Sequence, residues 1–117
     1  MNVNKKIEEL LKSFGLPYDY GKFMGSAGKY IVYNCTGATP EEFADDEPQS
    51  ETTNIQIHLY CKKNIDYTKD KKELKKAIVK AGFDYPRTEL EELEEDTDLW
   101  HICLETSITY GINEPAE

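Results

Sequence analysis

The sequence predicts an α+β fold in which a mainly antiparallel sheet of about four strands is packed by two helices, in the order α-β-β-α-β-β. Two segments carry apolar residues at helical spacing, and four others alternate in polarity or are rich in β-branched and aromatic residues. The chain has 117 residues, close to the usual size of one domain. We therefore expect a single domain covering residues 1–117, with both helices on one side of the sheet.

The first helix is expected near the N-terminus, where five apolar residues recur at helical spacing: Val3, Ile7, Leu10, Leu11 and Phe14. Gly15, followed by Leu16 and Pro17, supplies a stop. Residues 18–28 contain three glycines and no regular pattern, which predicts a connecting segment with room for a short strand near Phe23.

Two strands are expected next. Residues 29–35, KYIVYNC, are rich in β-branched and aromatic side chains. Residues 52–63 alternate strictly, which places Ile55, Ile57, Leu59 and Cys61 on one face and Asn54, Gln56, His58 and Tyr60 on the other.

The second helix and a final hairpin complete the fold. Asp70 and Glu73 suggest a capping box, and an apolar stripe follows until Gly82: Leu74, Ala77, Ile78 and Ala81. Residues 88–95 fit a helix or a strand; we favour a strand, because residues 99–111 alternate again after a charged turn. We expect the polar tail, residues 111–117, to be flexible.

A long loop is expected between the first two strands. Residues 36–51 make a connection of sixteen residues, whereas hairpin loops usually take two to five. One interpretation is a disordered tip, and the other is a protruding arm that contacts a partner. In the second, Phe43 anchors the arm, and three neighbouring carboxylates steer its association: Asp45, Asp46 and Glu47.

Charge is divided unevenly along the chain. The net charge of −9 disfavours general nucleic-acid binding, which depends on Lys and Arg neutralising phosphates. Residues 62–80 nevertheless contain eight lysines and three acidic residues, a balance of +5, and the remainder has six basic and 20 acidic residues, a balance of −14. This division suits contacts between copies of the chain. The expected basic contact residues are Lys72, Lys75 and Lys76.

The sequence offers no catalytic or cofactor-binding pattern, so we expect no enzyme, no metal and no cofactor. His58 and Cys61 differ by an odd number of positions and point to opposite faces, while His101 and Cys103 share a face but have no evident activating base. Cys35, Cys61 and Cys103 lack the close spacing of zinc ligands, and structural thiols are expected. No apolar run is long enough to span a membrane and no secretory signal is visible, which favours the cytoplasm.

The order of elements resembles the tail terminator, or tail completion, proteins of long-tailed bacteriophages and prophages. The resemblance covers residues 7–110, and its most suggestive part is EEDTDLWHICLETSITYG, which is similar to the final hairpin of those proteins. It implies a structural protein that forms a ring, typically of six subunits, at the head-proximal end of the tail tube. Its partners would be the tail-tube and head-connector proteins, and it would occur in the host cytoplasm during assembly and then in the virion tail.

Two other classes stay open. An acidic DNA mimic, or another small protein-interaction domain, would use the same carboxylates as phosphate surrogates against a basic partner. A small enzyme would depend on a Cys or His for turnover.

Overall fold

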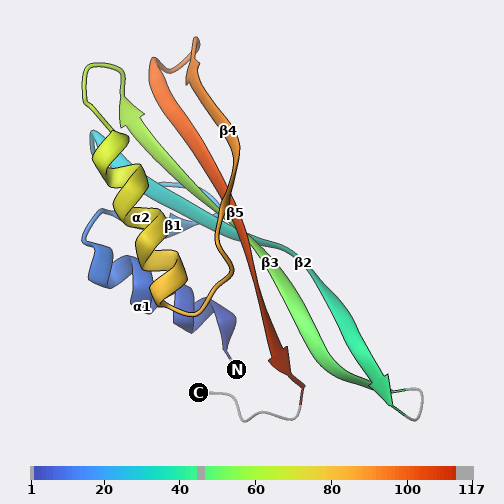
Figure 1. Ribbon diagram of the computed structural model, residues 1–117. Coiled ribbons are helices and arrows are strands. Elements are labelled where there is room, and N and C mark those ends of the chain that lie inside the picture. The colour runs from blue at the N-terminus through green and yellow to red at the C-terminus, as the bar shows by residue number, and fades with distance from the viewer. Residues whose placement is uncertain (1, 45–46, 113–117) are drawn as a thin grey trace.

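The computed structural model describes residues 2–44 and 47–112, with the side chain of Pro48 left aside. One five-stranded sheet runs through the molecule, and both helices lie on one face of it (Figure 1). The strand order is β1-β2-β3-β5-β4. The elements are α1 (Val3–Phe14), β1 (Tyr18–Tyr20), β2 (Lys29–Ala44), β3 (Glu47–Lys62), α2 (Thr68–Lys80), β4 (Arg87–Glu94) and β5 (Leu99–Gly111).

The predicted fold class was wrong in the number and order of its strands. The chain follows the order α-β-β-β-α-β-β, and the missed strand, β1, pairs in parallel with β2 from Tyr18↔Ile31 to Tyr20↔Tyr33. The sheet is therefore mixed, with an antiparallel ladder across β2, β3, β5 and β4. The sequence left room for a short strand near Phe23, but the strand lies earlier, at Tyr18–Tyr20, and Phe23 is outside it. A strand of three residues is too short to show an alternating pattern, so the sequence did not locate it.

Both helices form where their apolar stripes predicted. Asn2 caps α1 by accepting a hydrogen bond from the Lys5 backbone N–H at 3.0 Å, and Gly15 ends it in the left-handed conformation at φ +98°. The predicted capping box of α2 was wrong. The helix begins earlier, and the carboxylate of Asp66 accepts from the Thr68 N–H at 2.9 Å.

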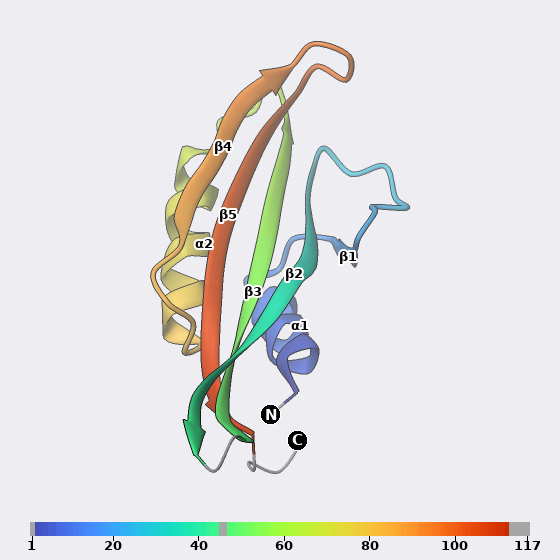
Figure 2. The same ribbon diagram turned by 90° about the vertical axis from the view of Figure 1, so that its right-hand side faces the viewer.

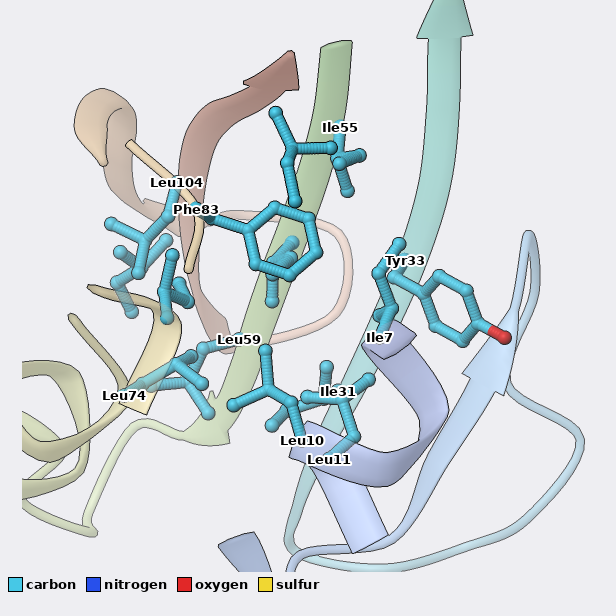
Figure 3. Packing of buried hydrophobic residues seen from close by; sticks show 14 residues of the cluster. Ile7, Leu10, Leu11, Ile31, Tyr33, Ile55, Leu59, Leu74, Phe83 and Leu104 are labelled. Atoms are coloured by element: carbon cyan, nitrogen blue, oxygen red, sulfur yellow. The ribbon is translucent and has the colours of Figure 1, made fainter. Parts of the chain in front are cut away.

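The core lies between the helices and one face of the sheet (Figure 3). Ile7 and Leu11 of α1, and Leu74 and Ile78 of α2, are fully buried against the strands. The predicted inward face of β3 is confirmed, because its four members are all buried: Ile55, Ile57, Leu59 and Cys61. Burial of these large aliphatic side chains is the main stabilising term of the fold.

The final hairpin is confirmed. Residues 87–94 form a strand rather than a helix, and β4 pairs with β5 from Arg87↔Glu105 to Glu94↔Leu99. A register shift between Thr88 and Leu90 interrupts the ladder.

The predicted long loop between the first two strands was also wrong. β2 and β3 continue to pair antiparallel through this region as far as Ala44↔Glu47, with one register shift between Cys35 and Gly37. We call residues 36–44 and 47–51 the arm. It extends past the ends of both helices (Figures 1 and 2), in a molecule that measures 55 × 24 × 24 Å.

Candidate interaction surfaces

The arm leaves most of its side chains in solvent. Every residue from 36 to 44 is exposed, including Phe43, whose exposed fraction is 60%. Pro40 lies in β2 beyond the stretch that pairs with β1, so this part of β2 forms an edge of the sheet, where proline is tolerated.

Polar contacts and a third strand hold the arm together. Thr52 Oγ1 lies 2.6 Å from Thr109 Oγ1 and donates to Glu41 Oε2 at 2.9 Å. β5 pairs with β3 as far as Ser50↔Gly111, and the Ile112 N–H bonds the Gln49 carbonyl at 3.1 Å. The described residues beyond that point, including Phe43, belong to β2 and β3 alone. A two-stranded ribbon is weakly stable by itself, so the end of the arm gains most from an external contact.

The structure separates the predicted interface residues into two groups. Phe43 and Glu47 are both exposed at the end of the arm, in the pairs Phe43↔Pro48 and Ala44↔Glu47. Asp45 and Asp46 lie outside the described residues. The predicted lysines all lie on α2: Lys72 and Lys76 are exposed, whereas Lys75 is partly buried with its ammonium 5.9 Å from the centre of the Tyr85 ring.

A groove of about 700 Å³ lies between α1 and α2, and the sequence did not reveal it. Apolar side chains contributed by both helices and the segment after α1 line it: Leu10, Phe14, Leu16, Ala77 and Ala81. Three lysines of α2 also line it: Lys69, Lys76 and Lys80. Asp70, a further lining residue, is paired with Lys29 at 2.8 Å. The groove depends on how the two helices are spaced, which no sequence pattern specifies.

The sheet face away from the helices carries a row of rings that crosses three strands. The Phe23 and Tyr30 ring centres are 4.1 Å apart, those of Tyr30 and Tyr60 are 5.0 Å apart, and those of Tyr60 and His101 are 4.4 Å apart. All three pairs are stacked, with interplanar angles of 11°, 19° and 17°. The two faces of Tyr30 and of Tyr60 are thereby occupied by other rings, so they are not open to stack nucleic-acid bases.

Two histidines and a carboxylate form a hydrogen-bonded chain beside this row. His58 Nδ1 lies 2.8 Å from His101 Nε2, and His101 Nδ1 lies 3.2 Å from Glu94 Oε2. Burial, and then the charge of His101, lower the pKa of His58. The alternation of β3 and β5 placed both histidines outside the helix-packed core, but only the register Tyr60↔His101 and His58↔Cys103 shows that they meet.

The three cysteines are free thiols, and burial raises the pKa of each. Cys61 lies in the core beneath the helices, whereas Cys103 lies on the opposite face and has a pKa raised to about 11 by burial and then by Glu105 and Glu89. Cys35 is partly exposed. Thiols with raised pKa values are protonated at neutral pH and weak nucleophiles.

Many carboxylates along β4 and β5 have basic or hydroxyl partners within the chain. Glu91 pairs with Lys71 and accepts from the Tyr67 hydroxyl, while Arg87 contacts Glu89 at 2.8 Å and Glu105 at 3.0 Å. A DNA mimic needs carboxylates that are free to engage a basic groove. Because these carboxylates of β4 and β5 are already paired within the chain, they favour a role in holding the fold together over a role as phosphate mimics.

No cluster of three or more histidine, cysteine, aspartate or glutamate residues suited to hold a metal occurs within residues 2–44 and 47–112. In that same part of the chain, no helix combines the length and apolar character required to cross a bilayer. The sequence matches no protein-family model and no curated protein.

Proposed function

We propose that this protein is a structural subunit that assembles head to tail into a ring, and that the ring caps the tail tube of a long-tailed bacteriophage or prophage. In this role it ends polymerisation of the tube and helps to join tail to head. It acts in the host cytoplasm during assembly and then in the virion tail, without catalysis or a cofactor.

The exposed arm is the observation that carries this proposal. A strand pair with an aromatic residue 60% exposed at its end adds little to the protein's own core. An unprotected strand edge and an exposed aromatic residue both favour unwanted association, so we expect them to be covered in the working assembly. A neighbouring subunit or the tube supplies that cover.

The positions and charges of the surfaces favour a head-to-tail contact. The arm carries Glu41, Glu42 and Glu47, and α2 carries the exposed Lys72 and Lys76. These groups lie on different parts of the molecule, so one copy can offer its arm while it receives another copy elsewhere (Figure 1). A contact between two different patches closes into a ring when the rotation between copies permits.

The test is a mass measurement combined with electron microscopy. The purified protein is examined over a range of concentrations, alone and with a tail-tube protein of a long-tailed bacteriophage. We expect rings of uniform size, free or seated on tube ends, and tubes that stop growing. Reversing Lys72, Lys75 and Lys76 to Glu should weaken this assembly without unfolding the chain, because none of the three is in the core. A protein that stays monomeric and leaves tube growth unchanged would overturn the proposal.

A further inference from the structure

The end of the arm and the groove between α1 and α2 are complementary in polarity and in charge. We infer that Phe43 of one copy docks in this groove on the next copy. This inference rests on the proposed ring assembly and names the contact that builds it.

The end of the arm presents one apolar ring surrounded by acidic groups. Phe43 is 60% exposed, and Glu41, Glu42 and Glu47 are exposed around it in the strand pair. Glu42 has a left-handed backbone with φ +52°, an uncommon conformation for a residue other than glycine. An aromatic residue within a polar rim is the usual composition of an interface anchor.

The groove presents the matching surface. Its volume of about 700 Å³ is ample for one phenylalanine side chain, and its apolar wall includes Leu10, Phe14 and Ala77. Lys69, Lys76 and Lys80 provide positive charge beside that wall. The nearby Asp70 is neutralised by Lys29, so among the described lining residues Glu73 is the carboxylate that remains against the three lysines.

A second copy is the occupant that fits best. The arm extends past the ends of its own helices (Figures 1 and 2), and Phe43 is not among the described residues that line the groove of the same chain. Another hollow, of about 270 Å³, is lined by Asp84, Arg87 and Glu105 among others. Arg87 is already paired with Glu105 there, so this hollow offers an acidic arm no unpaired positive charge among its described lining residues. The basic groove and the acidic arm are thus matched within one sequence, and every copy carries both halves of the contact.

The experiment mixes two variants, each with one half of the contact removed. Phe43→Ala removes the anchor, and Lys76→Glu with Lys80→Glu reverses charge at the groove. Each variant alone should associate at least about tenfold more weakly than the wild type, the usual loss for an interface anchor. A mixture restores one intact contact, in which the arm of the groove variant meets the groove of the arm variant. Sedimentation velocity should therefore show heterodimers in the mixture that neither variant forms alone.

Matched controls separate this contact from general effects of polarity and charge. Met24→Ala removes another exposed apolar side chain, and Lys5→Glu with Lys63→Glu makes the same change of charge away from the groove. Both controls should assemble like the wild type. Rings that form normally from either test variant, or a mixture without heterodimers, would overturn the inference and leave the proposed ring standing. A wild-type protein that forms no ring with or without tube protein would overturn both.

Discussion

The two halves of β2 and β3 belong to one continuous ladder but lie in opposite environments. In the first half, Ile31 and Tyr33 pair with Leu59 and Ile57, and all four are buried beneath the helices. In the arm, the paired residues include Pro40↔Glu51 and Glu41↔Ser50, and the β2 members are exposed. The half that packs beneath the helices fixes the register of the two strands. In the arm the same backbone pairing continues, although no hydrophobic core covers it. Strand structure can therefore extend well beyond the hydrophobic pattern that begins it.

The largest contrast between the two halves should be in stability. Leu59→Ala leaves a cavity in a fully buried site and should lower the free energy of unfolding by about 2–5 kcal/mol. Phe43→Ala, at the exposed end of the arm, should change it by less than about 0.5 kcal/mol. Urea denaturation followed by circular dichroism measures both. Equal losses in the two variants would show that the arm is part of the core.

The cysteines should also differ in how much they stabilise the fold, according to how deeply each is buried. Cys61→Ser places a hydroxyl in the core and should lower the free energy of unfolding by roughly 1–3 kcal/mol, whereas Cys35→Ser, which is partly exposed, should have a smaller effect. In the native protein a thiol reagent should modify Cys35 first. Rapid modification of all three thiols would contradict this order.

The contact between His58 and His101, on the sheet face away from the helices, should make the stability of the fold depend on pH. The pKa of His58 in the folded protein lies below its ordinary value of 6.5. As the pH falls, His58 is therefore protonated in the unfolded chain before it is protonated in the folded protein, which favours unfolding. The contribution of His58 to stability is complete above the unfolded pKa and is lost as pH falls toward the folded one. The neighbouring His101, Glu94 and Cys103 remain in His58→Gln, which should lose less stability than the wild type between about pH 7.5 and about pH 5. Identical pH profiles in denaturation experiments would refute this assignment.

The smallest effect should come from the ion pair between β2 and α2. Lys29 and Asp70 lie 2.8 Å apart, but both side chains are partly exposed, at 31% and 23%. A double-mutant cycle with alanine at each position should give a coupling below about 1 kcal/mol. A larger value would mean that charge, rather than apolar packing, holds α2 against the sheet.

Sequence patterns predicted the parts of the fold that have a core behind them. The apolar stripes located both helices, and alternation assigned the buried face of β3. Alternation did not predict the strands of the arm, because TGATPEEFA does not alternate in polarity. Its strand structure depends on the register that the buried part of β2 and β3 sets. Of the candidate surfaces, Phe43 could be singled out as an aromatic residue without a core pattern. The groove and the histidine chain depend on helix spacing and strand register, which are properties of the folded chain.

We expect the arm to contribute to assembly far more than to the fold. Deleting residues 38–49 and measuring the thermal midpoint and the mass of the same preparation tests it most directly. Closure of a shorter connection changes the loop entropy by only about 0.6 kcal/mol per twofold change in length, so we expect a folded protein with a midpoint within several degrees of the wild type. We also expect it to remain monomeric under conditions in which the wild type forms rings. A deletion variant that still forms rings, or one that no longer folds, would contradict this division of roles between the arm and the core.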